Sequence, residues 1–238
     1  MWNKVIGIMG GMGPEATIDL YARITEAACA RGAVRDQDHP EVVISSVPQT
    51  PDRTEAIVAD GPSPEPELIR SARRLEAAGA GLIVIACNAA CHFLPAIRGA
   101  VGIPVLDLTE IAVRRIRERH PSVRRAGVMA TDGTLRSRLY QRRLAEAGLE
   151  ALVPDRENQR LLMEAVYGAE GIKAVSASGR APEKLEAVAG HLVGVGAQLL
   201  IAGCTEIPLA LRAGKLDVPL LDPATELASA ALEAAAGS

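Results

Sequence analysis

Short runs of apolar residues recur along the chain, separated by longer stretches in which apolar residues return every three or four positions. The runs are rich in Val, Ile and Leu and lie at 5–9, 42–47, 82–86, 101–108, 126–130, 198–203 and 218–222. Continuous apolar runs of this length predict parallel strands that are buried on both faces. Helical spacing is clearest for Leu68, Ala72 and Leu75, and for Leu185, Val188, Leu192 and Val195. Strands that alternate with helices indicate an α/β fold.

Two parts of the chain repeat one pattern, Leu-x3-Gly-Ala-x-Leu-x4-Cys, which ends at Cys87 and again at Cys204. Upstream, the segment 7–9 resembles 127–129, and downstream 103–110 resembles 218–226. Any two strand–helix units share some of this pattern, but three landmarks in the same order favour an internal duplication. We therefore predict two domains. One is formed by residues 1–111 and 218–238 and carries Cys87, and the other is formed by residues 112–217 and carries Cys204.

The duplication has a chemical consequence. Ligands bind beyond the carboxyl ends of parallel strands, and both cysteines follow such an end. If the two halves face each other, the two thiols approach one ligand from opposite sides. Removal of a proton from one face of a carbon and delivery to the other is racemisation or epimerisation. A thiol suits both steps, because its reference pKa of about 8.5 lies close to neutrality.

One of the two sulfurs must be a thiolate, and a helix N-terminus does not achieve this alone. It stabilises a nearby anion by about 0.3–1 kcal/mol, which corresponds to less than one pKa unit. A further cation or hydrogen-bond donor near the thiol would raise the thiolate fraction, and the ammonium group of the substrate or a nearby lysine could serve.

Composition narrows the class of partner. The chain has 238 residues, of which 48% are hydrophobic and 2% aromatic, and its formal net charge is −3. This charge gives no basic surface for nucleic acid or an anionic membrane, and stacking platforms are improbable with so few aromatic rings. The N-terminal apolar run is too short for a signal peptide or a membrane span. The four cysteines then predict reduced thiols in a cytoplasmic protein that binds a small molecule.

Five segments together resemble the aspartate/glutamate racemase family. They are GIMGGMGPEAT (7–17), PDRT (51–54), ACNAACHF (86–93), GIKA (171–174) and GCTEIPL (203–209). The resemblance spans nearly the whole chain. It implies two flavodoxin-like domains related by pseudo-symmetry, an active-site cleft between them, a homodimer, and no pyridoxal phosphate or metal. It also implies that Cys87 and Cys204 transfer protons to and from aspartate or glutamate.

The same resemblance assigns substrate-binding residues. Asn88 and Thr205 would hold the α-carboxylate, helped by backbone N–H groups at two helix starts. Arg53 would fork onto the side-chain carboxylate, and Lys173 would be a second cation in the cleft. The other expected substrate-binding residues are Gly11, Met12, Ala89, Thr131, Thr134 and Glu206.

Two residues depart from the family pattern. Ala89 stands where the family usually has Thr, and Cys91 where it usually has His. Loss of a hydroxyl that binds the substrate would cost on the order of 1 kcal/mol, so substrate preference or activity is expected to differ from that of typical members. Cys91 could be a third reactive cysteine, although a small buried helix residue one turn after Cys87 is the favoured interpretation.

Two other classes of protein compete with this interpretation. Gly11-x-Gly13-x-x-Ala16 follows a strand and precedes a helix, as in a nicotinamide-dinucleotide site. This hypothesis is weaker, because no acidic residue ends the next strand and the paired cysteines stay unexplained. A zinc-binding module would use the segment 87–92, yet no second ligand pair is visible near any other histidine. A cysteine-dependent isomerase or decarboxylase of another diacid remains open, as does the choice between aspartate and glutamate.

Overall fold

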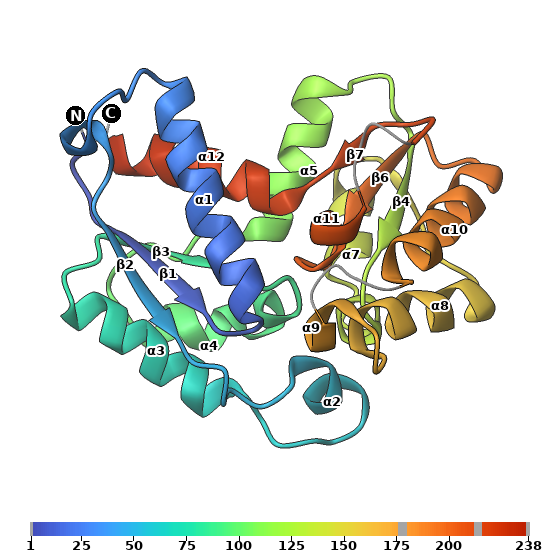
Figure 1. Cartoon of the computed structure of the whole chain (residues 1–238), viewed down its shortest axis with the longest axis horizontal. Coiled ribbons are helices and arrows are strands. Elements are labelled where there is room, and N and C mark those ends of the chain that lie inside the picture. Colours follow the sequence, from blue (N-terminus) through green and yellow to red (C-terminus); the bar gives the residue numbers. More distant parts are fainter. Residues whose placement is uncertain (1, 176–179, 212–215, 237–238) are drawn as a thin grey trace.

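Two parallel sheets organise the chain, as a computed structural model of residues 2–175, 180–211 and 216–236 shows (Figure 1). The first sheet has the order β2-β1-β3, with β1 at Ile6–Gly10, β2 at Val42–Ser46 and β3 at Leu82–Ile85. The second has the order β5-β4-β6-β7, with β4 at Arg125–Met129, β5 at Glu150–Leu152, β6 at Leu199–Ala202 and β7 at Leu220–Leu221. The predicted α/β fold with parallel sheets is confirmed.

The two sheets repeat one topology. Each begins with its central strand, adds the next strand on one side and then the third strand on the other. Val105 forms an isolated parallel bridge with Ile83, and so takes the place in the first sheet that β7 takes in the second. This shared order agrees with the internal duplication inferred from the sequence.

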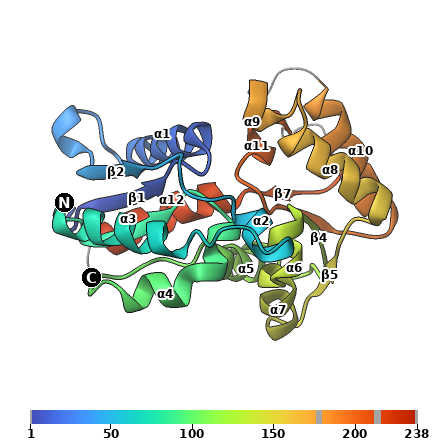
Figure 2. The ribbon, with the colours of Figure 1, turned by 90° about the horizontal axis from the view of Figure 1, so that it is seen from below.

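Helices cover both faces of the first sheet (Figures 1 and 2). The helices α1 and α12 lie against each other on one face, and α3 and α4 lie on the other. The helices of this part are α1 (Pro14–Ala30), α2 (Arg53–Val58), α3 (Glu65–Ala77), α4 (Leu94–Gly99) and α5 (Leu108–Arg119), with short 3-10 turns η1 (Asp36–Asp38) and η2 (Ala89–Phe93).

The second sheet is flanked by α6 (Asp132–Arg136), α7 (Leu139–Glu146), α8 (Arg156–Tyr167), α9 (Ile172–Val175), α10 (Ala181–Gly194) and α11 (Ile207–Ala210). After β7 the chain returns to the first sheet as α12 (Pro223–Ala236), which packs against α1 and α5. We refer to the first sheet with α1–α5 and α12 as the first half, and to the second sheet with α6–α11 as the second half. The domain boundaries after residues 111 and 217 stay a prediction. Among the described residues, no helix combines the length and the apolar character needed to span a membrane.

The two faces of the second sheet belong to different hydrophobic clusters. Val128 and Ile201 pack into a core that is continuous with the first half, whereas Met129 and Leu200 pack into a second core with α8 and α10. Neighbouring residues of a strand point to opposite faces, so one short sheet serves both cores. The burial of both faces explains why β4 and β6 are continuous apolar runs in the sequence.

Equivalent glycines let a helix approach each central strand. A Cβ atom on Gly7 would lie 2.9 Å from the Cβ of Ala80 and 3.4 Å from that of Leu75. A Cβ atom on Gly127 would lie 3.1 Å from the Cβ of Ala197 and 3.2 Å from that of Leu192. These residues are the ones that the duplicated sequence pattern superposes. The pattern therefore reflects the same contact between a helix and a central strand in both halves.

Some sequence predictions about elements were wrong. The run 101–108 forms no strand beyond the single bridge at Val105, because α5 already begins at Leu108 with Asp107 as its N-cap. The strand β2 is an edge strand rather than a buried one, and its Ile44 is 42% exposed. Val195 lies just beyond the end of α10 and is also exposed, while the short edge strand β5 was missed because it is too short to give a run.

We predict that Gly7→Ala lowers the free energy of unfolding by about 1–3 kcal/mol, the cost typical of an overpacked core. The added methyl group meets Ala80 and the carbonyl oxygen of Leu82, which lies 3.1 Å from its position, and neither can rotate away. Urea unfolding at neutral pH measures the change. The matched control is Gly190→Ala in α10, where the methyl group has nothing within 4 Å and helix propensity favours Ala. Equal destabilisation by both substitutions would contradict the packing argument.

Candidate active site

The carboxyl ends of the strands in both sheets converge on one small cavity of about 20 Å³. Its lining contains every predicted site residue except Gly11. The lining residues are Met12, Arg53, Cys87, Asn88, Ala89, Thr131, Thr134, Tyr167, Lys173, Gly203, Cys204, Thr205 and Glu206. Both halves contribute, so residues far apart in the sequence form a single enclosed site.

Cys87 follows the end of β3 after Ala86 and is 6% exposed. Arg53 reaches the cavity from the start of α2, which Asp52 caps by accepting hydrogen bonds from the backbone N–H groups of Thr54 and Glu55. Burial lowers the pKa of the Arg53 guanidinium, but its electrostatic interactions with Cys87 and Asp52 outweigh burial and raise the pKa. Arg53 is therefore a permanent cation beside the first cysteine.

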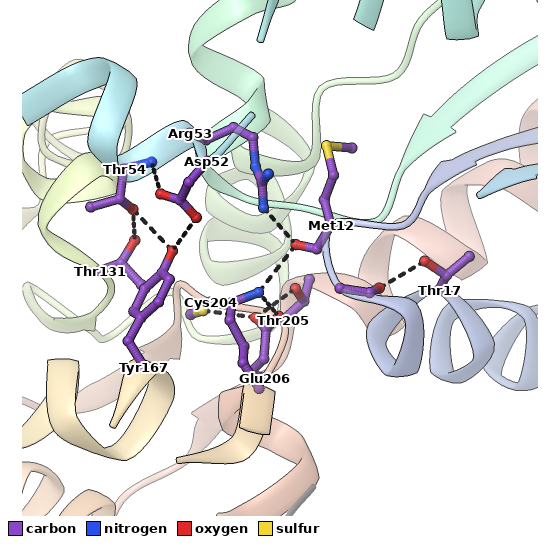
Figure 3. Close-up of polar contacts among 12 residues, drawn as sticks. Met12, Thr17, Asp52, Arg53, Thr54, Thr131, Tyr167, Cys204, Thr205 and Glu206 are labelled. Atoms are coloured by element: carbon purple, nitrogen blue, oxygen red, sulfur yellow. Dashed lines mark hydrogen bonds and ion pairs between the residues drawn. The ribbon is translucent and has the colours of Figure 1, made fainter. Parts of the chain in front are cut away.

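The guanidinium group of Arg53 is held by backbone oxygens. Nη1 donates to the carbonyl oxygens of Thr50 (3.2 Å) and Pro51 (2.9 Å), and Nη2 donates to that of Met12 (3.2 Å; Figure 3). Two buried donors in the cavity lining, Arg53 Nε and Asn88 Nδ2, have no hydrogen-bond partner among the described residues. Buried donors without partners are costly, which makes these two atoms natural points of attachment for an anionic ligand.

Cys204 follows β6 and is surrounded differently. Its Sγ–H donates to Glu206 Oε2 at 2.9 Å, and the Thr205 hydroxyl donates to the same oxygen at 3.1 Å (Figure 3). Lys173 donates to the other carboxylate oxygen, Oε1, at 2.5 Å. Burial and the Glu206 carboxylate raise the pKa of the Cys204 thiol well above its usual value, and Lys173 offsets only part of this effect. Cys204 is therefore a protonated thiol in this arrangement.

Lys173 and Glu206 form an ion pair whose charges persist. Burial raises the pKa of Glu206, but Lys173 and the hydrogen bonds from Cys204 and Thr205 prevail and lower it. Burial likewise lowers the pKa of Lys173, but Glu206 prevails and raises it. The pair therefore carries both charges at neutral pH.

The Met12 carbonyl joins the two halves at the edge of the cavity. It accepts from Arg53 of the first half and from Lys173 Nζ of the second half, at 3.4 Å. A larger groove of about 470 Å³ adjoins the cavity, and four residues line both spaces: Met12, Arg53, Lys173 and Glu206.

The model of the Asp/Glu/Hydantoin racemase family matches residues 9–231. The chain belongs to this family. It is 28% identical over 232 residues to a broad specificity amino-acid racemase, RacX, of Bacillus subtilis, a match that covers 94% of this chain and 95% of that protein. Among solved structures, aspartate racemase from Picrophilus torridus is similar with a TM-score of 0.86 at 25% identity, covering 98% of this chain and 94% of that one. An aspartate racemase homologue from Pyrococcus horikoshii is similar with a TM-score of 0.74 at 27% identity, covering 98% and 99%.

Tyr167, at the end of α8, lines the cavity although no motif pointed to it. Its hydroxyl donates to Asp52 Oδ2 at 3.1 Å and lies 3.3 Å from the hydroxyl of Thr54, which in turn donates to Thr131 at 3.4 Å (Figure 3). The Lys173 ammonium lies 5.6 Å from the centre of the Tyr167 ring, within cation–π range. A lone tyrosine in a helix gives no sequence signal, because only the fold brings it to the first half.

The two departures from the family pattern have different surroundings. Ala89 lines the cavity and begins η2. The hydroxyl group of the family's usual Thr is therefore absent from the cavity wall at this position. Cys91 is buried outside the lining, and its Sγ lies 3.8 Å from the carbonyl oxygen of Cys87. Burial raises the pKa of Cys91 far above the usual value. The favoured interpretation of Cys91 as a small buried residue fits this environment.

The competing classes find little support in the geometry. At the dinucleotide-like turn, the space in front of Gly13 holds the side chains of Lys173 and Glu206, where a pyrophosphate would have to lie. Within the described residues, no three His, Cys, Asp or Glu side chains gather in a way that could hold a metal ion. His92, proposed for the zinc module, is exposed and contacts Phe93 edge to face.

The Lys173–Glu206 pair predicts a pH-dependent stability. The folded pKa of Glu206 is lowered, so its contribution is complete above the ordinary glutamate value of about 4.3 and is lost as the pH falls through the folded value. The folded pKa of Lys173 is raised, so its contribution is complete below about 10.4 and is lost as the pH rises through the folded value. We expect Glu206→Gln to cost about 1–3 kcal/mol of unfolding free energy between about pH 5 and 10, and progressively less as the pH falls through the lowered folded pKa of Glu206.

Thermal unfolding across this pH range measures the difference from the wild type. The matched control is Glu183→Gln, which removes an ion pair with Arg180 in which both side chains are more than 70% exposed. Such a pair contributes about 0–1 kcal/mol. A cost of Glu206→Gln that is the same at acid and neutral pH would refute the ion-pair explanation.

Proposed function

We propose that the chain is a racemase that needs no cofactor and interconverts the L and D forms of aspartate or glutamate through Cys87 and Cys204. The observation that carries this proposal is the convergence of the two sulfurs on one enclosed cavity from opposite halves of the fold. The family membership and the racemase names of the relatives support it. Assembly as a homodimer in the cytoplasm remains a prediction.

The two sulfurs have complementary surroundings for a two-base reaction. Arg53 supplies a positive charge beside Cys87, which suits a thiolate. Cys204 retains its proton through burial and the bond to Glu206. In this scheme the Cys87 thiolate removes the α-proton, and the Cys204 thiol delivers a proton to the opposite face. The reverse reaction starts from a Cys204 thiolate, to which Lys173 supplies the nearby cation.

Side-chain cations matter here because the helices that follow the cysteines are short. The turn η2 and the helix α11 have five and four residues, and so offer little of the helix dipole that a long helix would supply. In the proposed complex, Asn88 Nδ2 and Thr205 bind the α-carboxylate, and Arg53 binds the side-chain carboxylate. These interactions would orient the α-proton between the two sulfurs.

The substrate must enter from the adjoining groove. A cavity of about 20 Å³ has room for about one water molecule, whereas an amino acid is several times larger. We propose that the contacts of Lys173 and Arg53 with the Met12 carbonyl separate on entry. Both cations would then exchange this carbonyl for the substrate.

The two-base scheme predicts that Cys87→Ser and Cys204→Ser each lower racemisation at least about 100-fold, because each removes one of the proton-transfer groups. The wild type should exchange the α-hydrogen of aspartate or glutamate with deuterated solvent without added cofactor, as followed by proton NMR and chiral chromatography. Each variant would retain exchange of one enantiomer only. The matched control is Cys29→Ser, because Cys29 is exposed and lies outside the cavity. Full racemisation by either active-site variant would refute two-base transfer.

The assignment of Arg53 predicts a substrate-dependent effect of Arg53→Lys. Lysine keeps a positive charge beside Cys87 but lacks the planar fork that binds a carboxylate. We expect kcat/KM for aspartate and glutamate to fall about 10- to 100-fold, and kcat/KM for alanine, if alanine is turned over, to change less than about 3-fold. The assay uses a panel of acidic, neutral and basic amino acids, because a relative has broad specificity. An equal loss for acidic and neutral substrates would place Arg53 in a role other than recognition of the side-chain carboxylate.

A further inference from the structure

Tyr140 is a buried tyrosine that contacts both cysteine-bearing loops. It lies on α7 of the second half and is fully buried. Its hydroxyl lies 2.5 Å from Oδ1 of Asn88, the residue after Cys87 in the first half. Its ring lies against Gly203, the residue before Cys204, because a Cβ atom on Gly203 would be 3.2 Å from Tyr140 Cε2. Tyr140 itself does not line the cavity.

The hydrogen bond determines which end of the Asn88 amide faces Tyr140. Burial raises the pKa of the Tyr140 phenol well above its usual value, so the phenol stays protonated and needs an acceptor. The amide oxygen can only accept, whereas the amide nitrogen can only donate. With Oδ1 facing the phenol, the buried hydroxyl proton is satisfied. The opposite orientation would place the donor Nδ2 against the phenol and break this hydrogen bond.

The other end of the same amide is unpartnered. Asn88 is 2% exposed, it lines the cavity, and its Nδ2 donates to no group of the described residues. An unpartnered donor in a buried wall marks a position that a ligand acceptor completes. A carboxylate oxygen is the acceptor that the proposed substrates would bring there.

We propose that Tyr140 is a positioning residue that fixes the Asn88 amide with Nδ2 directed at the substrate carboxylate. The inference rests on the proposed function for the identity of the carboxylate. It assigns no contact between Tyr140 and the substrate. The same ring packs against Gly203. Tyr140 therefore also fixes the distance between Asn88 and the loop that carries Cys204.

The test is Tyr140→Phe, which keeps the ring on Gly203 and removes only the hydroxyl. Without it, the amide can rotate and no longer presents Nδ2 in one orientation. We expect the KM for aspartate or glutamate to rise about 3- to 10-fold, the range that corresponds to one hydrogen bond, with a smaller change in kcat. The matched control is Tyr21→Phe, because Tyr21 is an exposed tyrosine of α1 outside the cavity. A KM for Tyr140→Phe within 2-fold of that of the wild type would overturn the proposal.

A double-mutant cycle separates positioning from a general structural role. If Tyr140 acts through Asn88, then Tyr140→Phe added to Asn88→Ala leaves KM as it is in Asn88→Ala alone. If the two effects on KM multiply, Tyr140 supports the site in another way and the proposal is wrong. Thermal unfolding of each variant shows whether the fold is intact.

Asn88→Asp adds a check. The aspartate keeps an acceptor for the Tyr140 hydroxyl but lacks the Nδ2 donor, so substrate binding should remain weak.

Equilibrium titration of each variant with L-aspartate, L-glutamate and L-alanine distinguishes failure of this proposal from failure of the proposed function. A wild type that binds these amino acids without exchanging the α-hydrogen would refute the racemase function, while the Tyr140→Phe effect on binding would still support the positioning role. Binding that is unchanged by Tyr140→Phe would refute the positioning role alone. A wild type that binds no amino acid of the panel would overturn both.

Discussion

Charge balance inside an enclosed cavity is the constraint on which the rest of the site depends. Two sulfurs, a carboxylate, an ammonium group and a guanidinium group share a space with room for about one water molecule. Unpaired charges in such a space would be expensive. The charged groups are therefore placed with partners: Lys173 binds the Glu206 carboxylate next to Cys204, and Arg53 lies beside Cys87. The fold brings these partners together by placing the ends of two sheets against each other.

The parts of the fold that the sequence predicted depend on local or repeated signals. Buried parallel strands are continuous apolar runs, and the duplicated Leu-x3-Gly-Ala pattern marks a helix that packs closely on a central strand at Gly7 and at Gly127. The cysteines were predicted to be at equivalent strand ends, and both follow such ends in the structure. The apolar run at 101–108 misled the prediction, because only Val105 pairs with β3, while Asp107 caps α5 and Leu108 begins it.

The parts that could not be predicted depend on contacts between the halves. Tyr167 and Tyr140 lie on helices of the second half, and their hydroxyl groups find their partners, Asp52 and Asn88, in the first. Nothing in the local sequence of either tyrosine differs from that of an ordinary helix residue. The contacts of the Met12 carbonyl oxygen with Arg53 and Lys173 could not be predicted either. A backbone oxygen has no side-chain signature in the sequence.

The symmetry of the fold and the asymmetry of its charges explain different parts of the proposed chemistry. Duplication provides two equivalent strand ends, and hence two thiols that face one ligand. Yet the alignment that superposes Cys87 on Cys204 also superposes Ala89 on Glu206. A carboxylate therefore accompanies only the second sulfur, where it accepts the thiol proton and raises the pKa of Cys204. A two-base racemase needs one thiolate and one thiol, and a perfectly symmetric site would leave that choice open. Ala89 and Glu206 occupy equivalent positions of the duplicated halves, so the carboxylate that accepts the Cys204 proton has no equivalent beside Cys87.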